Sequence, residues 1–307
     1  MRPQLPTLSG GGVVVSLHRY PVKSMAGESL DVVRVLAEHG LQGDRAFAVV
    51  DVETGRVASA KHPRRWGGLL GCTARFVGEL NDEQRRGPVV IGLPGGVTVR
   101  SDDGDVDAAL SAAFGRAVRL ADAPPPMARF DEDGPGQDRV RGVPLSVGAG
   151  VGTFFDLAPI HLVTTATLAR LRELRPASDF SVARFRPNLV IDTGEGPGFV
   201  ENDWLGQVIT IGDGVRLCVT FPCARCVMAT LAQPGLAADA AILRTAAEHN
   251  LQMFALRARM VPAIGVYAAV IRGGTIRPGD AVRLDGRSPL RRAAAFVHAV
   301  KRAVRRR

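Results

Sequence analysis

The chain has 307 residues, of which 46% are hydrophobic and 22% are charged. These values exclude a globally disordered chain and a disulfide-stapled mini-protein, and they allow one large domain or two smaller ones. The formal net charge is +9, but residues 287–307 alone contain seven Arg, one Lys and no acid. The rest of the chain is close to neutral and aromatic residues make up only 5%, which argues against a nucleic-acid partner.

No apolar run reaches the roughly 18 residues that a transmembrane helix needs. The first 12 residues are rich in Pro and Gly and lack the basic-then-apolar plan of a secretion signal. Three of the four cysteines lie within nine residues of one another, so a disulfide framework is not expected. We therefore expect a cytoplasmic protein without a transmembrane segment.

Short β-like runs, separated by turn signals, dominate residues 1–120. They lie at 13–17, 30–36, 46–51, 57–60, 69–76, 89–91 and 97–100, and a short helix is predicted at 103–114. Strands spaced this evenly, without long helices between them, are typical of a barrel or a compact mixed sheet. Residues 1–120 are therefore predicted to form an N-terminal domain of this kind.

Residues 121–150 contain ten Pro or Gly and are predicted to form a linker or surface loop. In residues 151–286, strands are predicted at 160–163, 182–192, 208–211, 215–221, 227–231, 265–271, 275–276 and 281–284, and helices at Thr165–Leu174 and 238–250. The predicted fold class is therefore β-rich α+β with a few peripheral helices.

Cys223 and Cys226 form a CxxC pair, which is half of a zinc site, a redox dithiol or inert core sulfur. Zinc needs two further ligands, and no second pair occurs at metal-ligand spacing. A thioredoxin-like dithiol lies at a helix N-terminus, whereas β-prone residues follow this pair. Arg225 places a cation between the cysteines and favours a thiolate, the form that a soft metal binds.

Several basic residues are candidates for binding an anion. Lysine is rare, with three residues among 39 basic ones; Lys23 and Ser24 follow the first predicted strand and suit an anionic oxygen such as a phosphate. A solvated turn lysine is the alternative. Asp44 and Arg45 form either a structural ion pair or an anion contact.

A second candidate group comprises Arg184, Arg186 and Asn188, which alternate within a predicted strand and are therefore expected on one face. Two guanidinium groups and an amide that point the same way need solvent or a polar, anionic ligand. The sequence contains no GxGxxG or P-loop motif, so a nucleotide site of the usual kinds is not predicted.

Seven segments, taken in order, resemble a known family. They are YPVKS (20–24), GLQGDR (40–45), HLVTTATLARL (161–171), RFRPNLVID (184–192), FVENDWLGQVITIG (199–212), PCARC (222–226) and GTIRPGDAVRL (274–284). The set resembles the MOSC-domain proteins that carry an N-terminal MOSC β-barrel domain. This group includes the mitochondrial amidoxime reducing component and the C-terminal part of molybdenum cofactor sulfurase. The resemblance implies an N-terminal β-barrel-like domain followed by a MOSC β-barrel domain at 151–286.

The resemblance further implies binding of the molybdenum cofactor, a molybdopterin that carries a phosphate. It makes Cys226 the molybdenum ligand and the catalytic residue. The cofactor contacts that it implies are Lys23, Ser24, Arg45, Thr165 (with Thr164 as the alternative hydroxyl), Arg184, Arg186 and Asn188. Met25 departs from the family, in which a cysteine is frequent at this position, so the loop adds no second thiol.

The resulting prediction is a molybdenum-dependent enzyme that reduces an N-hydroxylated small molecule of the hydroxylamine or amidoxime type. The enzyme is expected to be independent of pyridoxal phosphate and to take electrons from a separate donor protein of the flavin, haem or ferredoxin type. Asp203 is either its proton donor or a turn acid. The alternative function is a non-catalytic carrier of cofactor or sulfur that uses Cys226; a thiol–disulfide protein is a third.

Residues 287–307 are predicted to form a basic amphipathic C-terminal helix. The apolar positions at helical spacing are Leu290, Ala293, Ala294, Val297, Val300 and Val304. This helix either packs on the barrel or docks an acidic electron donor, because opposite charge raises the rate of association.

Overall fold

The structure is a computed structural model that describes residues 11–37, 39–81, 86–124, 130–131, 154–254 and 258–287. Strands make up 40% and helices 21%, which confirms the prediction of a β-rich chain with helices at its periphery. Most of the predicted linker at 121–150 and the predicted C-terminal helix, apart from Arg287, lie outside the described residues. No helix in the ranges described combines the length and the apolar character needed to span a membrane.

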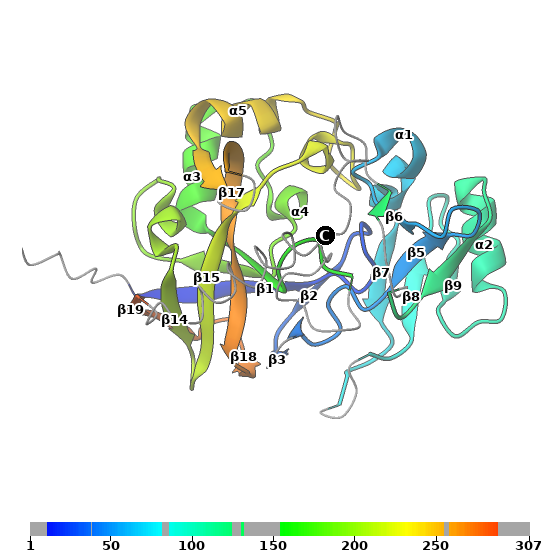
Figure 1. The fold of residues 1–307 in the computed structure, drawn as a ribbon, viewed down its shortest axis with the longest axis horizontal. Helices are drawn as coiled ribbons and strands as arrows, with labels where there is room; N and C mark the ends of the chain where they lie inside the picture. The colour runs from blue at the N-terminus through cyan, green and yellow to red at the C-terminus, as the bar shows by residue number, and fades with distance from the viewer. Residues whose placement is uncertain are drawn as a thin grey trace, which may run out of the picture.

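Seven strands close a barrel in one half of the molecule (Figure 1). In order around the barrel they are β12 (Ile160–Thr164), β13 (Leu189–Asp192), β1 (Gly12–Arg19), β19 (Ala281–Arg287), β14 (Gln207–Ile211), β15 (Val215–Ala224) and β17 (Arg259–Arg272). Pairing of β17 with β12 closes the ring, and only β12 and β13 are parallel neighbours in it. Outside the ring, β2 (Glu28–Leu30) pairs with β1, and β16 (Leu251–Phe254) pairs with β17.

The first strand of the chain is part of this barrel. β1 hydrogen-bonds β13 on one side and β19 on the other, and its Val14 and Leu17 are fully buried in the barrel core. Next to the barrel, β18 (Gly274–Ile276) pairs with β3 (Val33–Leu36), which also pairs with β4 (Gly40–Leu41). Residues from the predicted N-terminal segment 1–120 therefore form part of the half of the molecule that contains the barrel.

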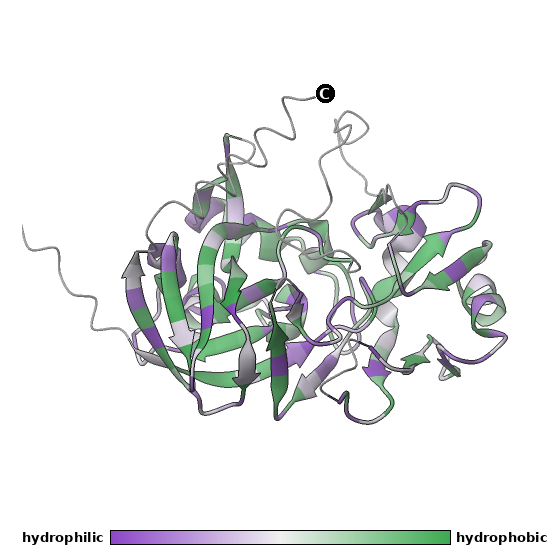
Figure 2. Cartoon of the chain, turned by 60° about the horizontal axis from the view of Figure 1, so that its bottom comes forward, coloured by the Kyte–Doolittle hydropathy of each residue, from purple (hydrophilic) through white to green (hydrophobic). Residues whose placement is uncertain are grey.

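The other half consists of two small sheets and short helices (Figure 1). One sheet has the order β10 (Val118–Ala121), β5 (Ala48–Asp51), β6 (Val57–Ala58), β11 (Phe130–Asp131); the other has the order β7 (Thr73–Phe76), β8 (Val89–Gly92), β9 (Thr98–Arg100). Its helices are α1 (Pro63–Trp66), the 3-10 helix η1 (Gly67–Gly71) and α2 (Val106–Phe114). The strands of both halves are largely hydrophobic (Figure 2), and Trp66 and Leu110 are buried in the core of this one.

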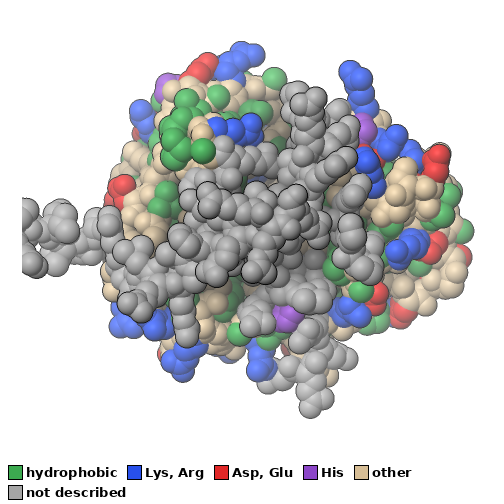
Figure 3. All heavy atoms as spheres, viewed as in Figure 1, with side chains coloured by type: hydrophobic (Ala, Val, Ile, Leu, Met, Phe, Trp, Pro, Cys, Tyr) green, Lys and Arg blue, Asp and Glu red, His purple; other side chains and the backbone are tan. Residues whose placement is uncertain are grey.

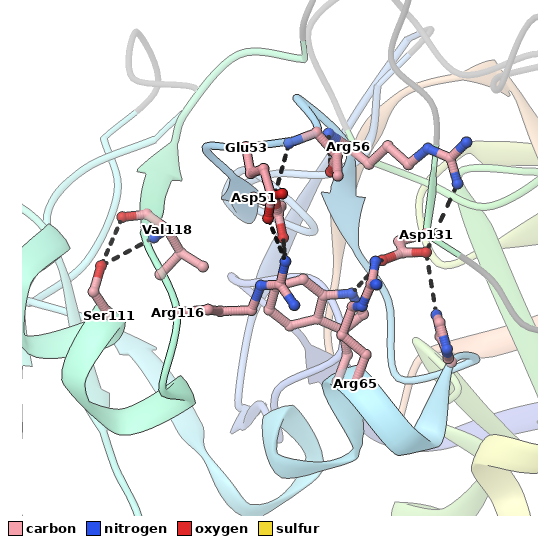
Figure 4. Close-up of polar contacts among 11 residues, drawn as sticks. Asp51, Glu53, Arg56, Arg65, Ser111, Arg116, Val118 and Asp131 are labelled. Carbon is pink, nitrogen blue, oxygen red and sulfur yellow. Dashed lines mark hydrogen bonds and ion pairs between the residues drawn. The ribbon is translucent and has the colours of Figure 1, made fainter.

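Asp131 holds the short strand β11 in place (Figure 4). Its carboxylate accepts hydrogen bonds from Trp66 Nε1 at 2.8 Å, Arg65 at 2.9 Å and His62 Nδ1 at 3.1 Å. Burial raises the pKa of Asp131, but these three donors outweigh burial and hold the pKa below its usual value. The end of β11 is therefore tied to α1, which lies more than 60 residues earlier in the chain.

Helices and 3-10 helices occupy all or part of three of the predicted strands. The strand predicted at 69–76 begins only at Thr73, after η1. Over 182–192, α4 (Val182–Phe185) is a helix, Arg186 has a left-handed backbone (φ 55°), and a strand begins only at Leu189. The expectation that Arg184, Arg186 and Asn188 share one strand face is therefore wrong, because a helical turn does not alternate. Residues 227–231 begin with the 3-10 helix η4 (Val227–Thr230).

The helices that flank the barrel agree with the sequence. α3 (Thr165–Leu174) has the predicted bounds, because the side chain of Thr164 accepts a hydrogen bond from Thr167 N and caps the helix. α5 (Ala241–His249) lies within the predicted 238–250. Both helices pack at one end of the barrel (Figure 1), and η3 (Val200–Trp204) contacts α3.

Candidate functional site

The two halves of the molecule meet at the loop that follows β1. The hydroxyl of Tyr20 donates a hydrogen bond to the carbonyl of Pro187 at 3.2 Å, and the guanidinium of Arg186 donates to the carbonyl of Met25 at 2.6 Å. These contacts join residues that are more than 160 positions apart. The YPVKS and RFRPN segments, separate in sequence, are therefore neighbours in the fold.

Two arginines from different halves lie against one aromatic ring. The guanidinium carbon of Arg186 is 4.3 Å, and that of Arg45 is 4.6 Å, from the centre of the Tyr20 ring, within the range of a cation–π contact. Arg45 also pairs with Asp44, whose carboxylate accepts a hydrogen bond from Tyr20 N at 2.8 Å. Burial and Asp44 raise the pKa of Tyr20 to about 12, although the arginines oppose the shift. The tyrosine is therefore a neutral platform for both cations.

Unfavourable backbone conformations concentrate at this junction. Four non-glycine residues of the described chain have a positive φ, and three of them are Ser24 (66°), Arg45 (47°) and Arg186 (55°). Such conformations cost on the order of 1 kcal/mol or more each and cluster at functional sites. The junction is consequently a candidate site on backbone geometry as well as on side-chain chemistry.

Basic side chains from several segments gather at the junction. We call its five basic residues the cation cluster: Lys23, Lys61, Arg45, Arg186 and Arg225. Among the described residues, Asp44 pairs with Arg45, and Asp156 pairs with Lys23 and Lys61. Burial, and then the charge of Arg45, lowers the pKa of Arg186 to about 10. A bound anion would relieve this repulsion.

The cation cluster differs from the basic residues on the surface. On the face shown in Figure 3, Lys and Arg side chains lie in small separate groups around the edge, with Asp and Glu among them. Lys23, by contrast, is only 4% exposed, so it is not a solvated turn lysine. Its Nζ pairs with Asp156, donates to the carbonyl of Phe154 at 3.2 Å and lies 3.8 Å from the centre of the Phe130 ring.

The two cysteines of the CxxC pair have different surroundings. Cys223 is 1% exposed, and its Sγ accepts a hydrogen bond from the Arg225 guanidinium at 3.0 Å. Cys226, just before η4, is half-buried, and no hydrogen bond to its Sγ is found within the described ranges. All four cysteines are free thiols. No group of three or more His, Cys, Asp or Glu that could hold a metal ion occurs in the part of the chain that the structure describes.

Arg184, Asn188 and Thr165 make hydrogen bonds within the protein. Arg184 donates to the carbonyls of Asp179 and Ala237, both at 2.7 Å, and of Ala229 and Leu231, both at 3.4 Å. The side chain of Asn188 accepts from His161 N at 3.1 Å and donates to the carbonyl of His18 at 3.3 Å. Thr165 donates to Asp192 at 2.8 Å. Arg184 thus organises the loop after Cys226, and Asn188 joins the strands around the site.

Lys23, Ser24, Arg45 and Arg186 are the predicted site residues that the fold brings to the junction. The hydroxyl of Ser24 accepts a hydrogen bond from Ala60 N at 3.2 Å. Asp203 is exposed in η3, where its backbone carbonyl accepts a hydrogen bond from Gln207.

Sequence reasoning missed five residues at the site: Tyr20, Lys61, Asp156, His161 and Tyr267. Tyr20 and His161 open two of the quoted segments, which was an available signal, whereas Lys61, Asp156 and Tyr267 lie in none. Burial, and then the charge of Arg225, lowers the pKa of His161 to about 3, so its imidazole is neutral. Burial and its hydrogen bond to Cys223 raise the pKa of Tyr267 well above its usual value.

Comparison with known families agrees with this arrangement. A model of the MOSC domain matches residues 150–283, and a model of the MOSC N-terminal beta barrel domain matches residues 11–65. The chain belongs to the MOSC family. The resemblance expected from the seven segments is thereby confirmed, and MOSC domains are associated with the molybdenum cofactor.

Two solved structures resemble this MOSC protein distantly. The YUAD protein from Bacillus subtilis is 11% identical with a TM-score of 0.41, and the match covers 91% of this chain and 97% of that chain. YiiM from Geobacillus stearothermophilus is 20% identical with a TM-score of 0.30, and the match covers 47% of this chain and 63% of that chain. Both similarities are too low to inform the function. A comparison with curated proteins gave no match.

Proposed function

We propose that this MOSC protein binds the molybdenum cofactor at the junction of its two halves and reduces N-hydroxylated small molecules of the hydroxylamine or amidoxime type. The observation that carries the proposal is the cation cluster, in which the buried Lys23 and Arg186 lie with the half-buried Arg45, Lys61 and Arg225. Arg225 links this cluster to the CxxC pair, because it donates to Cys223 and its charge also acts on Tyr20.

The residues of the junction fit this cofactor. Its phosphate is an anion, and Lys23, Arg45 and Arg186 offer both compact and planar cations to such a group. The Ser24 hydroxyl adds a further polar contact. The half-buried thiol of Cys226 suits a soft metal, and molybdenum bound by its pterin needs no cluster of protein ligands. We assign Arg184, Asn188 and Thr165 to supporting the site, since their hydrogen bonds go to other parts of the protein.

The proposed reaction converts a hydroxylamine or amidoxime into the amine or amidine and water. It consumes two electrons and two protons per substrate molecule. When bound, the cofactor supplies the two-electron redox centre. This chain's own residues hold the cofactor through the cation cluster, and the electrons come from a separate donor protein of the flavin, haem or ferredoxin type.

The experiment has two measurements on protein produced in a host that makes the cofactor. Metal analysis gives the molybdenum content, and a reduced viologen dye reports hydroxylamine-dependent oxidation. Molybdenum together with turnover supports the proposal. Molybdenum without turnover on hydroxylamines or amidoximes would favour a carrier of cofactor or sulfur that uses Cys226. Absence of molybdenum, with a titratable dithiol, would reject both and leave a thiol–disulfide protein.

A further inference from the structure

Two of the three lysines in the chain converge on a single carboxylate oxygen. Lys23 pairs with Oδ1 of Asp156, and the Nζ of Lys61 lies 3.2 Å from the same atom. Lys23 follows β1, Lys61 follows β6, and Asp156 precedes β12, so three distant segments meet here. The side chain of Asp156 remains 36% exposed, whereas that of Lys23 is 5% exposed.

The charge of Asp156 acts on the rest of the cation cluster as well. It is among the charges that raise the pKa of Arg45, and it opposes the lowering of the pKa of Arg186. Burial raises the pKa of Asp156, but Lys23 and Lys61 outweigh burial and hold it well below its usual value. Asp156 is thus ionised at neutral pH and provides negative charge inside the cluster.

Asp156 is attached to the fold in a way that allows its carboxylate to leave. The residue belongs to no helix or strand, and the strand ladder of the barrel begins only at Ile160. The preceding residue with a backbone anchor is Phe154, whose N donates to the carbonyl of Arg45 at 3.0 Å. Rotation of the Asp156 side chain therefore breaks two ion pairs and no hydrogen bond of the barrel.

We infer that the Asp156 carboxylate occupies an anion-binding subsite formed by Lys23 and Lys61, and that an incoming phosphate group displaces it. The identity of the ligand, the phosphate of the molybdenum cofactor, rests on the proposed function. The carboxylate offsets the repulsion between the two ammonium groups while the subsite has no ligand. The Asp156 carboxylate also competes with the ligand. The apparent affinity for the ligand is lower when fewer molecules have the subsite open. Lys61 is accordingly a ligand-binding residue.

Phosphate binding to the full chain tests the inference. The protein is produced in a host that cannot make the cofactor and is titrated with inorganic phosphate in a calorimeter at constant ionic strength. Asp156→Asn removes the competing charge, so we expect phosphate to bind about tenfold more tightly. Asp102→Asn is the matched control, because it removes the same charge from an exposed pair with Arg100 at 2.8 Å. Its affinity should equal that of the parent protein.

Equal phosphate affinity in the parent protein and the Asp156→Asn variant would overturn the inference. Asp156→Ser provides the same comparison should asparagine at this position prevent folding, which circular dichroism will show. In the Asp156→Asn background, Lys61→Gln should weaken phosphate binding at least fivefold, because a dianion loses one of its two ammonium partners. No change in this double variant would exclude Lys61 from the subsite and overturn the inference in that form.

Failure of the inference and failure of the proposed function are separable. In one case, Asp156→Asn binds phosphate more tightly than the parent protein, but the protein acquires no molybdenum in a host that makes the cofactor. This result would support the subsite and reject the cofactor as its ligand. The opposite result is that the parent protein acquires molybdenum, while its cofactor-free form binds phosphate as tightly as Asp156→Asn does. This result would support the proposed function and overturn the displacement of Asp156.

Discussion

Arg225 donates a hydrogen bond to the Sγ of Cys223 at 3.0 Å, so the cation inside the CxxC pair faces the buried sulfur. Tyr267 shares a hydrogen bond with the same sulfur. Cys223 thus belongs to an internal polar network, whereas Cys226 lies half-buried at the start of η4. The two sulfurs of the motif are therefore not equivalent, and their substitutions should have different effects.

Cys226→Ser should abolish molybdenum retention and reductase activity and leave the fold intact, because a neutral hydroxyl replaces thiolate poorly at a soft metal. Cys223→Ser should keep most of the molybdenum and cost about 1 kcal/mol of unfolding free energy, since serine can still accept from Arg225. Metal analysis and thermal unfolding measure both effects. Cys72→Ser, at a buried thiol of the other half, is the control. Equal loss of activity from Cys223→Ser and Cys226→Ser would favour a dithiol.

Arg186→Lys should lower cofactor retention. Lysine keeps the charge but loses the planar group that lies on Tyr20 and donates to the carbonyl of Met25. We expect the cofactor to bind about tenfold more weakly, equivalent to about 1.4 kcal/mol, and less molybdenum to be retained after gel filtration. Arg170→Lys changes an exposed helix pair and serves as the control. Retention equal to that of the parent protein would make Arg186 a structural cation only.

Arg184→Lys should lower the stability of the protein more than its affinity for the cofactor. The guanidinium spans carbonyls on both sides of the loop that follows Cys226, and an ammonium group cannot reach them together. We expect the unfolding free energy to fall by about 3 kcal/mol, because buried carbonyls lose a charged donor. Urea unfolding measures this loss. A variant as stable as the parent protein but depleted of molybdenum would instead show that Arg184 contacts the cofactor directly.

The unfolding free energy should decrease as the pH falls below 6.5, in part through His161. Its pKa is 6.5 in the unfolded chain and about 3 in the folded protein, so between these values the unfolded state binds more protons. The contribution is complete above pH 6.5 and falls by about 1.4 kcal/mol per pH unit toward pH 3. Urea unfolding at pH 7, 6 and 5 should show a shallower decrease in His161→Gln. His249→Gln, at an exposed histidine, should keep the slope of the parent protein.

Local signals in the sequence predicted much of the secondary structure. Thr164 caps α3, and Gly115 takes the left-handed conformation that ends α2, so both helix ends follow from single residues. The strand predicted at 265–271 is the second half of β17, which begins at Arg259 and extends to Arg272. Its first residues pair with β16, which the sequence did not reveal, because Leu251 and Met253 face outward and break the expected alternation.

The sequence predicted which residues belong to the candidate site, but it did not predict how these residues lie relative to one another. The motifs indicated Lys23, Arg45, Arg186 and Cys226, because rare lysines, clustered guanidiniums and a CxxC pair carry their chemistry in their residue type. Arg184 and Asn188 carry the same residue types, yet their partners are backbone carbonyls and amides. Residue type alone does not distinguish a cation that faces a ligand site from one that holds a loop.

The sequence by itself determined the β-rich class, the family and the residue types of the candidate site, because periodicity, turn residues and motifs are local properties of the chain. The tertiary structure alone decided which residues meet. It placed β1 in the barrel with β13 and β19, and it joined Lys23 to Asp156 across 133 positions. Such contacts depend on long-range packing and on burial, which sets the strength of each charge interaction, and neither is encoded within a short window of sequence.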